Sequence, residues 1–221
     1  MLAQSSRCEP IVHIVDDDES IRDTLEQLFL SVGLAARSFA TGIEFLEQAD
    51  PVSPGCLLSD VRLPQLGGLE LRDRLAAHGF LLPVVFMSGY ADIPMAVRGL
   101  RAGARDFLLK PLRDQDVLDA ANAAIEFDRH SRAVAIEGGQ VRLRYTTLTM
   151  REKQVASLIL SGRKNREVAD ALQLSEITVK IHRSNAMRKL KVRNVQDLVR
   201  MDRLLGFAIS ATSVQSEEQN S

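Results

Sequence analysis

The stretch LLSDVRLPQLGG, residues 57–68, decides the fold of the first half of this chain. A short apolar run stops at Asp60, and a proline and two glycines follow at once. This order is typical of a buried strand that ends in a tight loop. Because ligands of open parallel sheets bind at the carboxyl ends of the strands, Asp60 is a candidate functional residue. An aspartate in such a place can also serve only as a loop cap, so it needs partners to count as a site.

Strand-like and helical patterns alternate along the first half. Apolar runs occupy 11–15, 35–39, 56–59, 83–87 and 106–109. Helical periods follow them, with Ser20 and Thr41 as expected caps and expected helices at 68–77, 93–101 and from 113 to about 130. Five strands alternating with five helices predict an α/β fold, a doubly wound parallel sheet with helices on both faces.

Chemically matched side chains stand at the ends of these predicted strands: Asp16, Asp17, Asp60, Ser88 and Lys110. Clustered carboxylates repel one another unless a cation neutralises them, and carboxylate and carbonyl oxygens suit Mg²⁺. A metal, an ammonium and a hydroxyl together can hold the oxygens of a phosphoryl group that moves onto a carboxylate. The sequence therefore predicts a magnesium-assisted phosphoryl site at this edge.

The second half changes to helices alone. Thr149 with Glu152, Asn165, Ser175 and Asn194 are expected to cap four successive helices. A short helix, a three-residue turn and a longer helix follow one another at residues 165–190, which is the order of a helix-turn-helix. The sequence therefore predicts a four-helix, all-α domain.

The third of these helices has two unlike faces at 100° per residue. Its inward face carries Val179, His182, Ala186 and Leu190, and its outward face carries Ile177, Lys180, Ile181, Ser184 and Arg188. Isoleucines among cations suit a DNA major groove, where they meet thymine methyl groups. Neighbouring cations, among them Lys164, Arg183 and Lys189, would contact phosphates, although any one of them alone is more simply a solvated charge.

Composition and charge narrow the class of protein. The 221 residues are 45% hydrophobic and carry a net charge of −1. Residues 1–130 hold 12 Lys and Arg against 20 Asp and Glu, whereas residues 131–221 hold 16 against 9. The basic second half suggests a polyanionic partner. No apolar run reaches the roughly 20 residues of a membrane span and no secretory signal is visible, so we expect a cytoplasmic protein without a membrane partner.

Residues 1–127 resemble the receiver domain of two-component response regulators. The resemblance rests on the acidic cluster, the turn from Asp60 to Pro64 with Gly68, Ser88-Gly89, and Lys110-Pro111, where a cis bond is expected. It implies a flavodoxin-like sheet of order 2-1-3-4-5 and a phosphoryl group passed to Asp60 from a sensor histidine kinase. It further implies Mg²⁺ held by Asp16 (through water), Asp17, Asp60 and the Arg62 carbonyl, with Lys110 and Ser88 on the phosphate. Phe107 matches the family's aromatic switch position, but it lacks a hydroxyl and also suits plain core packing.

Residues 148–207 resemble the LuxR-type DNA-binding domain, on the patterns around Thr149, Asn165 and Ser175 to His182. The combination is similar to NarL/FixJ-class transcription regulators. It implies a homodimer on a double-stranded DNA operator, formed through Val195, Leu198 and Val199, and RNA polymerase as a further partner. Phosphorylation would promote dimerisation and DNA binding.

These resemblances divide the chain into a receiver at 1–127, a partly helical linker at 128–147, a DNA-binding domain at 148–207 and a disordered tail at 208–221. We expect no enzyme beyond self-phosphorylation and dephosphorylation of Asp60. Two alternatives stay open. Residues 16–20 also fit the nucleophile motif of haloacid-dehalogenase-type phosphatases, with Asp16 as nucleophile, and an inactive receiver could accompany constitutive DNA binding.

Overall fold

A computed structural model of the chain describes residues 9–89 and 103–206. The chain divides into two compact units, residues 1–132 and 133–221, which are taken in turn. The expected helix at 93–101 lies outside the described residues, as do the ends of the chain. Within the described ranges, no helix has both the length and the apolar character that a bilayer crossing requires.

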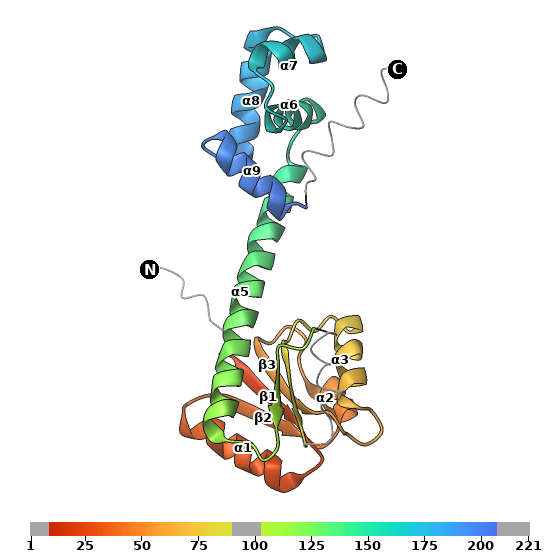
Figure 1. The fold of residues 1–221 in the computed structure, drawn as a ribbon. Coiled ribbons are helices and arrows are strands. Elements are labelled where there is room, and N and C mark those ends of the chain that lie inside the picture. The colour runs from red at the N-terminus through yellow and green to blue at the C-terminus, as the bar shows by residue number, and fades with distance from the viewer. Residues whose placement is uncertain (1–8, 90–102, 207–221) are drawn as a thin grey trace, which may run out of the picture. The chain divides into compact units, whose positions relative to one another are not determined.

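The first unit is built on one parallel sheet, which Figure 1 shows with α1, α2 and α3 around it. The sheet has five strands in the order β2-β1-β3-β4-β5. The central strand, β3, is buried along its whole length, as a strand covered on both faces should be. The sheet order is the predicted one. The strands are β1 (Ile11–Val15), β2 (Ala35–Phe39), β3 (Gly55–Asp60), β4 (Val84–Ser88) and β5 (Asp106–Leu109).

Helices cover both faces of this sheet. One core joins the sheet to α2 and α3 through residues such as Phe45, Leu71 and Phe86. The other core joins the opposite face to α1 and α5 through Phe29 and Ala121. The arrangement is the predicted doubly wound one, with bounds α1 (Glu19–Ser31), α2 (Gly42–Gln48), α3 (Gly68–Ala77) and α5 (Asp114–Thr146).

The start of α1 differs by two residues from the prediction. Asp18, not Ser20, is the N-cap, and its Oδ1 accepts a hydrogen bond from the Ser20 amide at 2.9 Å. The acidic run therefore supplies its own cap, because a carboxylate accepts from the exposed amides of a helix start at least as well as a hydroxyl. Thr41 caps α2 as predicted, accepting from the Glu44 amide at 3.1 Å.

Gly68 brings α3 close to the end of β3. A Cβ atom at this position would lie 2.3 Å from the carbonyl oxygen of Asp60, so only glycine allows the approach. The Gly68 amide donates to the Val61 carbonyl at 3.0 Å. The glycine of the opening motif thus fixes the loop that carries Asp60.

The opposite end of β3 is held by the middle of α5. The buried Asp128 carboxylate accepts from the Gly55 amide at 3.0 Å and pairs with Arg132 at 2.7 Å. Arg132 also donates to the carbonyls of Val52 (2.8 Å) and Ser53 (2.9 Å). These contacts tie α5 to the entry of the central strand.

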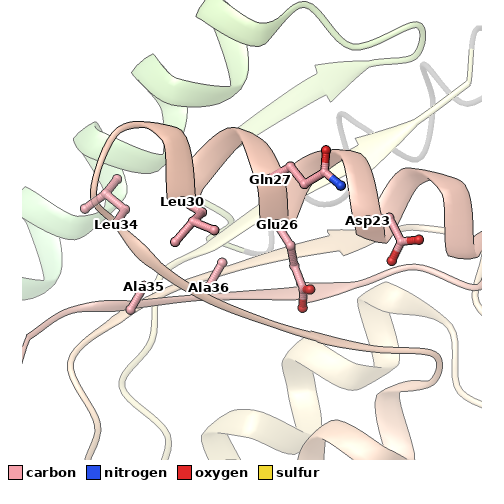
Figure 2. Close-up of a pocket in the computed structure, with 7 residues that line it drawn as sticks. All are labelled: Asp23, Glu26, Gln27, Leu30, Leu34, Ala35 and Ala36. Atoms are coloured by element: carbon pink, nitrogen blue, oxygen red, sulfur yellow. The ribbon is translucent and has the colours of Figure 1, made fainter.

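One backbone amide on the edge strand β2 is occupied by a side chain. The Ser38 amide donates to Glu26 Oε1 of α1 at 2.8 Å, so a side chain occupies a donor that an edge strand would otherwise expose. Beside it, α1 and β2 enclose a groove of about 330 Å³ (Figure 2). The groove is lined by Asp23, Glu26, Gln27, Leu30, Leu34, Ala35 and Ala36.

The second unit is a helical domain around one core that includes Val155, Val168, Val179 and Leu190. The capping box of Thr149 and Glu152 and the caps at Ser175 and Asn194 are confirmed. Its helices are α6 (Met150–Leu160), α7 (Asn165–Leu172), α8 (Glu176–Leu190) and α9 (Val195–Leu204).

The predicted cap at Asn165 is wrong. Lys164 occupies the N-cap position of α7, and its amide donates to Glu167 at 2.6 Å. The Asn165 side chain instead accepts from Arg183 of α8 at 3.1 Å. The Asn165 side chain was predicted to cap α7, but it is hydrogen-bonded to α8 instead.

Helix α5 extends well past the predicted end near His130. It continues through Gly138 and Gly139 to Thr146, where Val141 is buried in the core of the second unit. Neither glycine is sterically required: a Cβ at Gly138 would meet only the Leu204 carbonyl at 3.7 Å, and one at Gly139 would meet nothing within 4 Å. Packing at Val141 outweighs the weak helix propensity of the two glycines.

Candidate functional site

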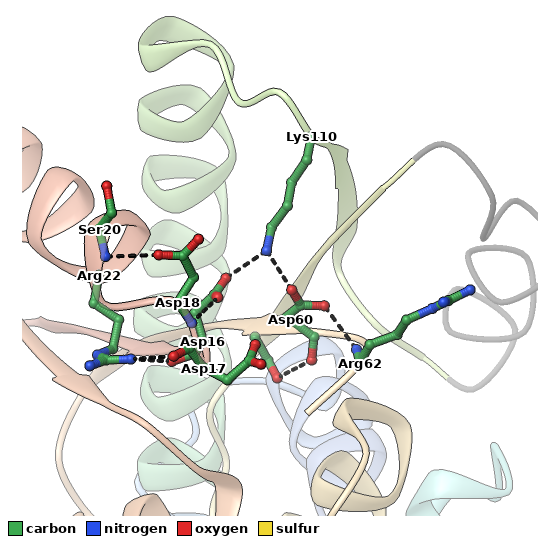
Figure 3. A network of polar contacts seen from close by, with 9 residues as sticks. Asp16, Asp17, Asp18, Ser20, Arg22, Asp60, Arg62 and Lys110 are labelled. Atoms are coloured by element: carbon green, nitrogen blue, oxygen red, sulfur yellow. Dashed lines mark hydrogen bonds and ion pairs between the residues drawn. The ribbon is translucent and has the colours of Figure 1, made fainter. Parts of the chain in front are cut away.

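The carboxyl edge of the sheet brings the predicted acids together (Figure 3). Asp16 follows β1 and is fully buried, Asp17 is exposed, and Asp60 ends β3 with 8% of its surface accessible. Each offers a carboxylate oxygen, and all three oxygens lie within 4.8 Å of one another. Among the described residues this is the acidic group suited to a metal ion.

Lys110 lies between two of these acids. Its ammonium donates to Asp16 Oδ2 at 2.8 Å and to Asp60 Oδ2. Burial by itself lowers the pKa of Lys110, but the hydrogen bonds to the two carboxylates outweigh burial and hold the pKa above its ordinary value. The lysine is therefore a fixed positive charge. The Lys110-Pro111 bond is cis, as expected.

The two buried acids differ in their surroundings. Burial raises the pKa of Asp16, although hydrogen bonds from Lys110 and from the Asp18 amide (3.0 Å) partly offset this. Asp60 Oδ1 accepts from the Arg62 amide at 2.8 Å. Asp60 thus has one oxygen held by the backbone and the other facing a cation.

The remaining predicted residues of this edge lie at the end of β4, on β5 and just after β3. Ser88 is buried at the end of β4, and its carbonyl accepts from the Lys110 amide at 2.8 Å. Phe107 lies three residues before Lys110 on β5 and packs, partly buried, against the core on the α2 and α3 face. Arg62 places its backbone beside Asp60 through the amide contact just described.

The predicted faces of α8 are confirmed, while its contacts with DNA stay a prediction. Val179, Ala186 and Leu190 are buried, and His182 is partly buried. Ile177 is 71% exposed and Ile181 is 55% exposed. Lys180, Ser184 and Arg188 share this exposed side, and Lys164 is exposed at the start of α7.

Two predicted phosphate contacts are engaged inside the domain. Arg183 donates to Asn165, as described above, and the Lys189 ammonium contacts Glu152 at 2.6 Å and the Thr147 carbonyl at 3.2 Å. Burial alone would raise the pKa of Glu152, but the Lys189 contact and the Thr149 amide lower it overall. Lys189 therefore stabilises the packing of α8 against the start of α6. Its partner Glu152 is 37 residues away in the sequence, so local patterns do not indicate this contact.

The predicted dimer residues on α9 do not share one surface. Leu198 is completely buried in the core of its own domain, whereas Val199 is 38% exposed and Val195 is partly buried. Leu198 therefore packs inside its own domain, and the predicted dimer contact stays a prediction.

Family models match both units. The response regulator receiver domain matches residues 12–122, and the luxR family of bacterial regulatory proteins matches residues 146–202. The chain belongs to the NarL/FixJ family of response regulators. It is a two-component transcription regulator, with a receiver and a LuxR-type DNA-binding domain. This assignment leaves the phosphatase alternative without support.

Relatives of this response regulator match over most of their length. It is 43% identical over 202 residues to nodulation protein W of Bradyrhizobium diazoefficiens, covering 91% of this chain and 89% of that protein. It is 40% identical over 193 residues to response regulator protein TmoT of Ectopseudomonas mendocina, covering 87% and 88%. It is 36% identical over 199 residues to transcriptional regulatory protein FixJ of Rhizobium meliloti, covering 90% and 98%.

Solved structures agree with the assignment. The response regulator StyR is matched with a TM-score of 0.76 at 38% identity, covering 88% of this chain and 98% of that one. Full-length FixJ from B. japonicum is matched with a TM-score of 0.56 at 31% identity, covering 90% and 98%.

Sequence reasoning missed one residue at the carboxyl edge. Arg22 of α1 donates from Nη1 to the carbonyls of Asp16 (2.8 Å) and Asp17 (3.1 Å) (Figure 3). The available signal was a cation four residues past the last aspartate of the acidic run, one helical turn along, where it can fold back over the loop.

Proposed function

We propose that this regulator accepts a phosphoryl group on Asp60 from a sensor histidine kinase, with Mg²⁺ bound, and that the modified protein binds operator DNA as a homodimer. The observation that carries the proposal is the group of Asp16, Asp17, Asp60 and Lys110 at one sheet edge. Buried charges of this kind are costly to keep unless they serve a function.

The residues suit Mg²⁺. Carboxylate oxygens are its preferred protein ligands, and opposite ligands of an ion bound at 2.0–2.1 Å stand roughly 4 Å apart. The three carboxylates already offer oxygens within 4.8 Å of one another. Asp16 (through water), Asp17, Asp60 and the Arg62 carbonyl would hold the ion, which would supply positive charge to the oxygens of the transferring group.

Asp60 would act as the nucleophile. One of its carboxylate oxygens attacks the phosphorus of a phosphohistidine, the new P–O bond forms as the P–N bond breaks, and the imidazole leaves with the electron pair. Lys110 faces the same carboxylate and would pair with the phosphate, which carries nearly two negative charges. The Ser88 hydroxyl would donate to a phosphate oxygen, and hydrolysis of the acyl phosphate would restore Asp60.

Helix α8 would read the operator. Its exposed Ile177 and Ile181 suit thymine methyl groups, while Lys180 and Arg188 suit base edges or phosphates. A homodimer through the exposed part of α9 would match a two-fold site. We further propose that the regulator works with RNA polymerase in the cytoplasm, and that it has no catalytic activity beyond its own phosphorylation and dephosphorylation.

The test combines a phosphodonor with operator selection. Wild-type protein, Asp60→Asn and the control Asp73→Asn, an exposed acid on α3, are each treated with a small-molecule phosphodonor and Mg²⁺ and used to select random DNA. We expect an acyl phosphate and tighter DNA binding in the wild type and control, and neither in Asp60→Asn. Equal operator affinity with and without phosphodonor would instead support constitutive DNA binding.

A further inference from the structure

The loop that carries two of the proposed metal ligands is held from outside by one guanidinium. Arg22 Nη1 contacts the carbonyl oxygens of both Asp16 and Asp17, at 2.8 and 3.1 Å (Figure 3). The side chain is partly buried and comes from the first turns of α1, which the Asp18 cap attaches to the same loop. Helix, cap and guanidinium therefore fix one short backbone segment.

The two acids depend on this segment to different extents. The Asp16 carboxylate has its own restraints, because it contacts Lys110 and the Asp18 amide. Within the described parts of the chain, no hydrogen bond or ion pair is found for the Asp17 carboxylate, which is exposed. The backbone is therefore the part of Asp17 that the structure restrains, and Arg22 bonds that backbone directly.

We propose that Arg22 is a positioning residue for the magnesium site, acting on Asp17 and Asp16 through their backbone carbonyls. This inference rests on the proposed function. Groups that orient metal ligands without touching the metal are typically worth 10- to 100-fold in metal affinity. Arg22 is also a positive charge near a cation site, and this charge by itself would weaken Mg²⁺ binding. Positioning by Arg22 would strengthen Mg²⁺ binding and its charge would weaken it. The direction in which the Kd changes when the side chain is removed therefore shows which effect is larger.

The experiment is a calorimetric titration of the full-length protein with MgCl₂. Arg22→Met keeps an unbranched apolar stem and removes both the charge and the donors. We expect the Mg²⁺ Kd to rise by roughly tenfold. Arg74→Met, which removes the same charge from an exposed ion pair with Glu70 on α3, should leave the Kd unchanged. If Arg22 acted through charge alone, its removal would lower the Kd.

A second readout needs no metal. Amide hydrogen exchange at residues 16–18, measured in EDTA, should be faster in Arg22→Met and unchanged in Arg74→Met, because the bonded carbonyls hold the loop backbone. Circular dichroism checks that each variant is folded, and Arg22→Gln replaces Arg22→Met if the latter is not. A wild type that binds no Mg²⁺ overturns the proposed function. A wild type that binds, with a folded Arg22 variant that binds as well or better, overturns only the role of Arg22.

Discussion

The carboxyl edge of the receiver sheet and the outward face of α8 both depart from the usual separation of charged and apolar side chains, in opposite directions. At the receiver edge, Asp16 is fully buried and Asp60 is 8% exposed, although ionised groups belong in water. On α8, Ile177 and Ile181 are more than half exposed and share one helix face with Lys180 and Arg188, so that apolar side chains lie among cations in water. Each departure makes sense if a partner completes the site: a cation and a phosphoryl group in one case, a DNA groove in the other. Substitutions that alter the buried charges at the sheet edge should therefore change the stability of the receiver. Substitutions of the exposed isoleucines on α8 should change the affinity for DNA.

The largest effect is expected from Lys110→Met. It leaves two buried carboxylates without their cation, and we expect the free energy of unfolding in EDTA to fall by about 4 kcal/mol. Saturating Mg²⁺ should recover much of this loss, because the ion replaces the missing positive charge. Urea unfolding in the two media measures both quantities, and an equal loss with and without Mg²⁺ would show that the acids do not share an ion.

His13 extends the comparison to a buried base in the receiver. It is 2% exposed among Phe39 and Phe45, and among the described residues neither ring nitrogen has a hydrogen-bond partner. Burial, with a smaller effect from Arg37, lowers its pKa from 6.5 to about 4. Between pH 6.5 and about pH 4, His13 is protonated in the unfolded chain but stays neutral in the folded one. Over this range the free energy of unfolding therefore falls as the pH is lowered.

The expected loss from His13 over this window is about 3 kcal/mol, from about 1.4 kcal/mol per pKa unit. His13→Leu should match the wild type or exceed it at pH 7 and gain on it progressively as the pH falls to 4. Urea unfolding at several pH values tests this, with the exposed His78→Gln as control. A constant difference between wild type and His13→Leu across the window would contradict the prediction.

The two glycines in α5 mark the least supported part of that helix. From Ala133 to Gln140 no side chain is buried, whereas Arg132 before this stretch and Val141 after it are both anchored. Replacing Gly138 and Gly139 by alanine should strengthen the local helix by about 1.5 kcal/mol, or roughly tenfold slower amide exchange at residues 138–142. Gly33→Ala, at a positive φ outside the helix, should not protect these amides, and unchanged exchange in the double variant would show that the stretch is already rigid.

The smallest effect separates apolar from ionic recognition on the DNA side. Ile181→Ala should weaken binding to the selected operator by about 1 kcal/mol, or roughly fivefold, with no change in salt dependence. Lys164→Gln should weaken binding to all sequences alike and reduce the slope of log affinity against log salt by about 1. Fluorescence anisotropy at several salt concentrations measures both, and a changed salt slope in Ile181→Ala would refute the assignment.

Local patterns predicted what depends on nearby residues. The strands and the caps at Thr41, Thr149, Ser175 and Asn194 follow from apolar runs and short-range hydrogen bonds, whereas the order of the strands came from the resemblance to receiver domains. The wrong cap of α1, where Asp18 takes the place predicted for Ser20, is a local failure. Two other failures involve distant partners. Arg183 takes the Asn165 side chain from the helix start, and Glu152 engages Lys189. No local pattern reveals such contacts, because they form only once α6, α7 and α8 are packed together.

The residues of the functional sites divide in the same way into those that local patterns predict and those that they do not. Strand ends located the acids and the lysine, because topology alone brings the ends of parallel strands to one edge. Helical periodicity separated the two faces of α8, but it could not show that Leu198 of α9 is enclosed by its own domain. Arg22 was missed because its hydrogen bonds go to backbone carbonyls, so its place one helical turn past Asp18 was the only signal in the sequence.

The contacts of Asp128 and Arg132 with the start of β3 determine where a stable receiver fragment of this protein should end. A receiver fragment that stops at Phe127 would lose the acceptor of the Gly55 amide and both donors to the Val52 and Ser53 carbonyls. A fragment that stops after Arg132 would retain all of them. Residues 128–132 therefore decide whether an isolated receiver keeps the hydrogen bonds that hold the start of its central strand.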